Sequence, residues 1–286
     1  MIPNNPQEPY VAAHQILELQ STATLASNAL EQEEMAARPF TIRDHFRRGG
    51  YESSLFAPND DTSAAWLDRH LREGMPLLPI EYEASVFWSV LAKRNGDPAT
   101  SIQRALKRKM VTWQQAFAAA KRDDILFELP FWPDQAVGRA PLVYFSDSGL
   151  WHRAFSPYRD PLAIRNVRYD AKAWEGFDVN ALRRLTLPYA DCFIWRRDGP
   201  QAGEIDLVLH WRSGERWAIE ISRDPNKRAS PTFQQGVQIL GAVRKFIVRP
   251  GPPRLERRQN YEYIDIEGAL EAIADGCAAN AGRACE

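Results

Sequence analysis

The sequence has little cysteine and no long apolar run. Its three cysteines, Cys192, Cys277 and Cys285, are odd in number and lack metal-ligand spacing, which indicates reduced thiols rather than a disulfide framework or a zinc site. No segment approaches the roughly 18 consecutive apolar residues of a transmembrane helix. The N-terminus lacks the basic start and apolar run of a secretory signal. We therefore expect a cytoplasmic protein that does not enter a membrane.

A global excess of one charge is also missing. The formal net charge is -1, with 36 Lys and Arg against 37 Asp and Glu, so a nucleic-acid site would have to be a local basic patch. The sequence contains no G-x-x-x-x-G-K-[S/T] loop, and we therefore expect no ATP binding or hydrolysis. It contains no G-x-S-x-G motif, and its five histidines form no metal-binding pair. At 286 residues the chain is long enough for more than one domain.

The most informative feature present is an expected hairpin over residues 203–222. Two runs of β-branched and aromatic residues flank the turn composition Arg-Ser-Gly-Glu at 212–215. Each run carries one acid between apolar neighbours, Asp206 and Glu220, and an acid is costly to bury in such a strand. Two acids on adjacent strands could share a divalent cation. The alternative is a pair of edge strands whose acids lie in water.

The order of elements around this hairpin is itself a signature. The expected order is a helix at 173–185, strands at 192–195, 203–210 and 216–221, a helix at 232–244 and a strand at 245–248. A strand at 261–264 and a helix at 267–274 are expected to follow. With Glu175 on the first helix, Asp206 on the second strand and Glu220 on the third, this order resembles the core of the PD-(D/E)XK nucleases.

Most of the chain is similar, more specifically, to the C-terminal part of a bacterial family of predicted AAA+ ATPases, which carry a nuclease-like domain of unknown function. The matching pieces are residues 48–51, 142–150, 174–177, 195–196, 204–206 and 219–221. Two departures stand out. The ATPase core is absent, and Ser222 occupies the position where family members often carry the motif lysine.

The resemblance implies Mg²⁺ held by Asp206 and Glu220, with Glu175 as outer support and Ser222 as a degenerate lysine position. Because Ser222 is short and neutral, we expect a domain that does not cut DNA at a useful rate. Lys227 or Arg228, from the following loop, are alternative cations that would restore a Mg²⁺-dependent endonuclease. Glu204 is either a further ligand or an exposed edge acid, and alternation turns Arg223 to the opposite face of its strand. Trp195 and Trp217 are expected in the core.

A basic segment precedes this domain. Helices expected at 84–94, 101–109 and 112–122, followed by strands at 125–129 and 142–145 and a turn at 146–150, have the order of a winged helix. A basic stripe on such a module is typical of phosphate contact, and Gln can read adenine edges. The alternative is a solvated helical face in a protein-interaction module. The DNA-binding candidates are Arg104, Lys107, Arg108, Lys109, Gln114, Gln115, Lys121 and Arg122.

The sequence thus predicts an α/β protein in three parts. Residues 1–83 form a helical segment, with a helix at 12–37 and a short helix from Phe40 that Thr41 caps, as a remnant of the ATPase-associated region; 84–150 form the winged-helix-like domain, and 151–286 the PD-(D/E)XK-like domain. The expected function is DNA binding or complex assembly. The alternatives are a metal-dependent DNA endonuclease and a module that binds only protein, such as a partner ATPase.

Overall fold

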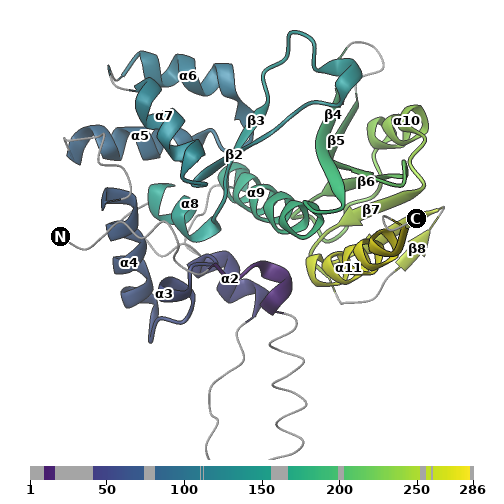
Figure 1. Ribbon diagram of the computed structural model, residues 1–286, viewed down its shortest axis with the longest axis horizontal. Helices are drawn as coiled ribbons and strands as arrows, with labels where there is room; N and C mark the ends of the chain where they lie inside the picture. Colours follow the sequence, from purple (N-terminus) through teal and green to yellow (C-terminus); the bar gives the residue numbers. More distant parts are fainter. Residues whose placement is uncertain are drawn as a thin grey trace, which may run out of the picture. The chain divides into compact units, whose positions relative to one another are not determined.

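The computed structural model describes residues 10–16, 41–73, 81–109, 111, 113–155, 167–198, 203–251, 256–258 and 260–283. The chain is a mixed α/β protein with two β-sheets, as predicted (Figure 1). It divides into two compact units. Unit 1 comprises Met1–Arg94, Gln103–Leu126 and Phe145–Asn166, and unit 2 comprises Asn95–Ile102, Phe127–Tyr144 and Val167–Glu286. None of the helices in these described ranges is both long and apolar enough to cross a membrane.

Unit 1 is built from short helices. Thr41 caps its first helix as predicted, because the Thr41 Oγ1 accepts a hydrogen bond from the Asp44 N–H at 3.1 Å and Asp44 Oδ2 accepts one from the Thr41 N–H at 2.9 Å. The expected helix at 12–37 lies mostly outside the described residues. The helices are α2 (Ile42–Arg48), α3 (Glu52–Leu55), α4 (Asp60–Glu73), α5 (Glu81–Lys93), α7 (Trp113–Arg122) and α8 (Ser148–Phe155), while α6 (Ala99–Lys107) begins in unit 2 and ends in unit 1.

The turn expected at 146–150 is wrong, because helix α8 begins there. The buried Asp147 starts the helix: its Oδ1 accepts from the Leu150 N–H at 2.8 Å, and its Oδ2 accepts from the Gly50 N–H at 2.7 Å. At Gly49, which has φ +76°, a Cβ would lie 2.2 Å from Asp147 Oδ1. Two pieces of the family resemblance, 48–51 and 142–150, therefore meet at one carboxylate, which links the segment after α2 to the start of α8.

Unit 2 contains a six-stranded sheet in the order β4-β5-β6-β7-β9-β8. The predicted hairpin is confirmed as antiparallel β5 and β6, and β6 continues in parallel into β7 and β9. Short β8 at the far edge, which was not predicted, pairs antiparallel with β9. The strands are β4 (Ala190–Arg197), β5 (Gly203–Trp211), β6 (Arg216–Ile221), β7 (Arg244–Val248), β8 (Glu256–Arg258) and β9 (Tyr261–Ile264).

Three helices of unit 2 depart from their expected bounds. Helix α9 (Val167–Thr186) begins six residues before the expected 173, and α11 (Ile266–Arg283) continues well past 274. Helix α10 (Pro231–Leu240) ends earlier than 244 because Gly241 adopts a left-handed conformation with φ 62° and caps it. The chain then enters β7 at Arg244, a strand that begins where the sequence pattern still favoured helix.

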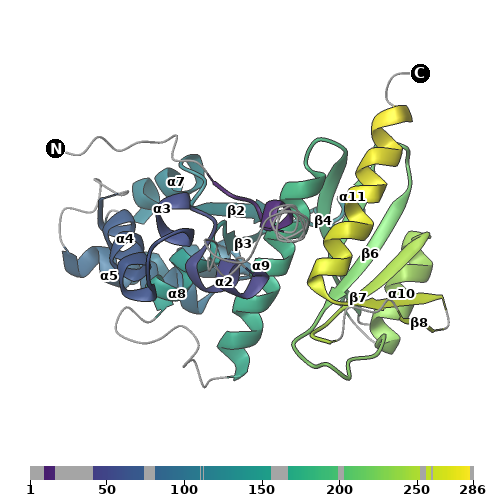
Figure 2. The same cartoon turned by 90° about the horizontal axis from the view of Figure 1, so that it is seen from below.

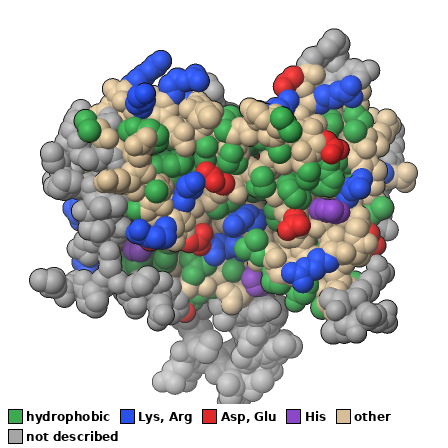
Figure 3. Space-filling view, turned by 45° about the horizontal axis from the view of Figure 1, so that its top comes forward, with side chains coloured by type: hydrophobic (Ala, Val, Ile, Leu, Met, Phe, Trp, Pro, Cys, Tyr) green, Lys and Arg blue, Asp and Glu red, His purple; other side chains and the backbone are tan. Residues whose placement is uncertain are grey.

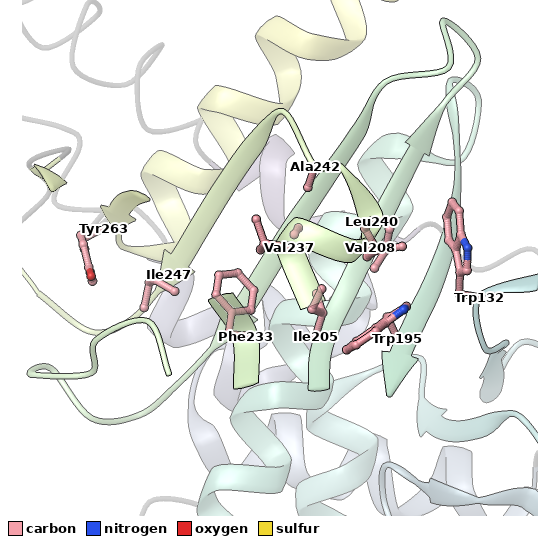
Figure 4. Packing of buried hydrophobic residues seen from close by; sticks show 11 residues of the cluster. Trp132, Trp195, Ile205, Val208, Phe233, Val237, Leu240, Ala242, Ile247 and Tyr263 are labelled. Atoms are coloured by element: carbon pink, nitrogen blue, oxygen red, sulfur yellow. The ribbon is translucent and has the colours of Figure 1, made fainter. Parts of the chain in front are cut away.

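Helices α10 and α11 cover opposite faces of this sheet (Figures 1 and 2). Beneath α10, residues of the sheet and the helix form one apolar cluster (Figure 4), whose members include Trp195, Ile205, Val208, Ala218, Phe233, Val237 and Ile247. On the other face, Gly276 of α11 admits the indole of Trp217, which a Cβ at that position would approach to 2.5 Å. Trp195 and Trp217 are 2% and 4% exposed, so the expectation that both belong to the core is confirmed.

The second sheet has three strands in the order β1-β3-β2. Strands β2 (Leu126–Leu129) and β3 (Leu142–Phe145) match the prediction, whereas β1 (Asp97–Pro98) was not expected. Two residues with a proline carry no strand pattern of their own. They form β1 because Asp97 pairs with Val143 and Pro98 with Leu142, a long-range contact that local sequence does not encode.

Candidate functional site

The hairpin brings the two predicted acids together. Leu207 pairs with Ile219 across β5 and β6, and this register continued by one residue sets Asp206 opposite Glu220. Directly opposed residues of an antiparallel pair share one face of the sheet. Asp206 Oδ2 also accepts a hydrogen bond from the Ile221 N–H at 2.7 Å, which ties this carboxylate to the end of β6.

A bulge in β5 adds to this placement. Phe193 of β4 pairs with Val208, but Trp195 pairs with Ile205, so three steps along β5 match two along β4. Asp206 lies within the extra stretch. Bulges redirect side chains and are frequent beside functional sites. The irregularity therefore allows Asp206 to face charged groups from more than one element, although its neighbours along the strand are buried and apolar.

The third predicted acid, Glu175 of α9, belongs to the same charged group. Its Oε1 accepts a hydrogen bond from the Tyr144 hydroxyl at 2.7 Å. Burial raises the pKa of Glu175, and the hydrogen bond from Tyr144 opposes that rise. Burial likewise raises the pKa of Asp206 well above its ordinary value, the negative charges of Glu175, Glu204 and Glu220 raise it further, and the Ile221 N–H opposes them. Like charges that surround one carboxylate in this way favour a proton or a cation between them.

The two carboxylate oxygens of Glu220 differ: one forms an ion pair, and the other has no hydrogen-bond partner among the described residues. Lys227 Nζ lies 2.6 Å from Glu220 Oε1. Glu220 is only 7% exposed, and its Oε2 is buried without a hydrogen-bond partner among the described residues. Sequence reasoning named Lys227 as one of two cations that could reach the site, and the structure brings this one to Glu220. Arg228, the other, is exposed.

The remaining residues of the motif take local partners. Ser222 Oγ accepts a hydrogen bond from the Asp224 N–H at 3.1 Å, so this hydroxyl takes part in the turn after β6. The Arg223 guanidinium lies 4.9 Å from the centre of the Trp174 ring on α9, the helix that also carries Glu175 and Asp178. Glu204 forms an ion pair with Arg196 across β4 and β5.

Sequence reasoning missed two residues beside this site. Tyr144, the donor to Glu175, comes from β3 and gave no local signal, because only the fold brings it to α9. Asp178 lies three residues after Glu175, on the same side of α9, and is fully buried. Burial raises the pKa of Asp178 well above its ordinary value, and the positive charge of Arg223 opposes the shift. The i, i+3 spacing of two acids next to Trp174 was the available signal.

The acids suit a weakly held divalent cation better than a closed metal cage. Within the ranges that the structure covers, no three His, Cys, Asp or Glu side chains lie close enough to hold a metal ion. Mg²⁺, however, typically takes one or two carboxylates and keeps several water ligands. Asp206 and the orphan Oε2 of Glu220 fit that requirement. A divalent ion there would offset the like-charge repulsion around Asp206.

The predicted DNA-binding residues all lie in unit 1, on α6, on α7 and between them. Arg104 and Lys107 are exposed on α6, three residues apart, and the exposed Arg108 follows directly after the helix ends. Figure 3 shows Lys and Arg side chains spread over one face of the molecule, with Asp and Glu side chains among them. Lys109, Gln114, Gln115 and Arg122 are exposed too, whereas Lys121 is half-buried. Two of the eight have local partners: Lys121 lies 5.4 Å from the centre of the Phe117 ring, and Arg122 pairs with Asp123 at 2.8 Å.

Comparison with known proteins gives relatives but no family. The chain is 29% identical over 220 residues to the uncharacterized protein Rv2008c of Mycobacterium tuberculosis and, to the same extent, to the uncharacterized protein Mb2031c of Mycobacterium bovis. The match covers 72% of this chain and 48% of each relative, so the chain spans about half the length of the curated relatives it matches. No family model and no solved structure matches.

Proposed function

We propose that this chain is a DNA-binding protein that contacts phosphates through the C-terminal part of helix α6 and through helix α7, both in unit 1. The observation that carries the proposal is the exposed row of Arg104 and Lys107 on α6 and Arg108 directly after it, in a chain whose net charge is -1. Concentrating cations on one helix against an otherwise balanced charge is the electrostatic pattern of phosphate contact.

The order of elements supports a winged helix as the module that presents these side chains. The chain runs α5-β1-α6-α7-β2-β3, and the three strands pair in the order β1-β3-β2. In helix-turn-helix modules the second helix of the pair enters the major groove. Here that helix is α7, whose exposed Gln114 and Gln115 have the amide groups that pair with adenine.

For unit 2 we propose a PD-(D/E)XK-like domain that binds a divalent cation through Asp206 and Glu220. The succession of α9, β4, β5, β6, α10 and β7, with the acids around Asp206, supports this assignment. The similarity to an ATPase-associated family remains part of the proposal. The relatives are about twice as long as the stretch that matches, which leaves room in them for a further domain.

DNA retention measured across salt concentration tests the proposed function. We compare the unmodified chain with the triple variant Arg104→Glu, Lys107→Glu and Arg108→Glu. The matched control reverses three exposed arginines elsewhere, Arg69, Arg72 and Arg212. Each lost phosphate contact removes about 0.9 from the slope of log affinity against log salt, so the α6 variant should lose roughly 2.7.

The control should keep the slope of the unmodified chain. Equal slopes for the α6 variant and the control would place the DNA site elsewhere. No retention of the unmodified chain even at low salt would contradict DNA binding and favour a module that binds only protein.

A further inference from the structure

We propose that Lys227 supplies the positive charge that Ser222 cannot, as a positioning residue for metal-assisted cleavage of a phosphodiester bond. The inference rests on the nuclease-like assignment of unit 2 and is independent of DNA binding through α6 and α7. It changes the expectation from the motif alone, which was a domain without useful cleavage.

The contact between Lys227 and Glu220 is built by the backbone around it. The Lys227 N–H donates to the Asp224 carbonyl at 3.0 Å, and the Asn226 N–H donates to Asp224 Oδ1 at 2.8 Å, which closes a tight turn directly after β6. Arg249 Nη1 donates to the Lys227 carbonyl at 3.0 Å and fixes this turn to the segment after β7. The turn therefore delivers the ammonium group to Glu220 from a defined direction.

Stability alone does not account for this ion pair. Glu220 is buried, whereas the Lys227 side chain is 32% exposed, so water weakens their attraction while Glu220 still loses its hydration. Glu220 also keeps its Oε2 buried without a hydrogen bond among the described residues, an additional cost. The register places Glu220 opposite Asp206, so a cation bound by both residues would satisfy Oε2, with Lys227 orienting the Glu220 carboxylate through Oε1.

The reaction is hydrolysis by water. A water oxygen forms a bond to phosphorus, the bond from phosphorus to the leaving sugar oxygen breaks, the water loses a proton to solvent and the leaving oxygen takes one up. A divalent cation at Asp206 and Glu220 would supply charge stabilisation on the phosphate. Lys227 Nζ holds Glu220 Oε1, which would leave Oε2 for the cation, and its charge offsets that of Glu220.

The test uses the full chain with plasmid DNA and Mg²⁺ or Mn²⁺. The variants are Lys227→Met, Lys227→Arg and, as the matched control, Arg228→Met in the same loop. We expect the unmodified chain to cut, Lys227→Met to lose roughly 10²–10³-fold in turnover with little change in KM for DNA, and Arg228→Met to cut normally. Lys227→Arg keeps the charge and should recover part of the turnover.

A second readout separates this role from a structural ion pair. Calorimetric titration with Mn²⁺ in the absence of DNA should show weaker binding to Lys227→Met, because Glu220 loses the ammonium group that orients it, and unchanged binding to Arg228→Met. The melting temperature without metal should be unchanged in Lys227→Met, whereas a purely structural ion pair predicts a lower one.

Two results would overturn the inference. One is an unmodified chain that binds DNA and Mn²⁺ but does not cut, which leaves the proposed DNA binding intact. The other is Lys227→Met that cuts like the unmodified chain. Conversely, cleavage that depends on Lys227 but persists after charge reversal on α6 would support the inference while contradicting the proposed DNA site.

Discussion

The two units handle charge in opposite ways. In unit 1, the side chains of Arg104, Lys107 and Arg108, at the end of α6 and directly after it, are exposed to water. Water and salt screen the repulsion between such neighbouring positive charges, so it costs little stability. In unit 2, acids lie partly or fully buried around Asp206, where burial and mutual repulsion raise the pKa of Asp206 and Glu175. An exposed basic row can arise from solubility alone. Buried acids are costly and need a compensating cause, so the physical argument for a site is stronger in unit 2.

The contrast between exposed cations in unit 1 and buried acids in unit 2 is tested most directly at Asp206. If the acids of unit 2 hold a divalent cation, Asp206→Asn removes one of its direct ligands. Loss of a residue that only supports a ligand typically weakens metal affinity roughly 10–100-fold, so Asp206→Asn should weaken Mn²⁺ binding by at least that much. Without metal the same variant should melt at a higher temperature, because it relieves repulsion from Glu175, Glu204 and Glu220. Titration calorimetry and thermal unfolding measure the two effects.

The Mn²⁺ affinity should also depend on pH, in a direction that the pKa of Asp206 determines. Only the ionised carboxylate binds the metal, and the pKa of Asp206 is raised, so Mn²⁺ affinity of the unmodified chain should increase as pH rises through that raised value. Glu271→Gln, at an exposed position on α11, is the control and should leave both affinity and pH profile unchanged. An unchanged Mn²⁺ affinity in Asp206→Asn would show that the acids serve another purpose.

Sequence pattern predicted this part of the molecule to a useful depth. The alternation of apolar residues around Asp206 and Glu220 defined both strands, and the turn composition at 212–215 joined them as a hairpin, so the pattern alone brings the two acids to adjacent strands. The two-residue β1, Tyr144 beside Glu175 and the bulge at Asp206 could not be predicted. Each depends on long-range pairing, and a single sequence carries no local signal for it.

Lys227 shows where the limit lies. The sequence placed it in a loop after β6, within reach of the acids, but could not choose between Lys227 and Arg228. Hydrogen bonds from the Lys227 N–H and from Arg249 decide the choice by fixing the turn. The predicted ends of α10 and α11 were wrong because the effect of a glycine depends on its tertiary contacts. Gly241 ends α10, whereas α11 continues through Gly276, against which Trp217 packs.

A smaller effect is expected at Asp178, the fully buried acid of α9. Because its pKa is higher in the folded than in the unfolded chain, the folded state binds more protons between those two values, and stability falls as pH rises through that window. Asp178→Asn keeps the shape and removes the ionisable group. Its melting temperature should exceed that of the unmodified chain by more at pH 8 than at pH 4, with roughly 2–4 °C for each kcal/mol relieved.

Asp191→Asn, at an exposed position on β4, is the matched control and should show no such pH-dependent gain. The comparison between the units would weaken if Asp178→Asn destabilised the chain equally at both pH values. That result would mean that the ionised carboxylate is needed, with Arg223 as its partner, and that burial of acids in unit 2 carries no net cost at this position.

The last prediction is that ATP does not change the melting temperature of the chain. The sequence has no glycine-rich loop ending in Gly-Lys-Ser or Gly-Lys-Thr, so backbone N–H groups are not arranged to hold a triphosphate. A specific ligand at 100 times its Kd stabilises by about 2.7 kcal/mol, a shift of several degrees that ATP should not produce here. The basic row on α6 could still attract any polyanion weakly, and salt separates the two cases. A shift that vanishes in roughly 0.2 M salt reflects that row, because surface attraction is screened. A shift that persists there would contradict the prediction and indicate a nucleotide site of another kind.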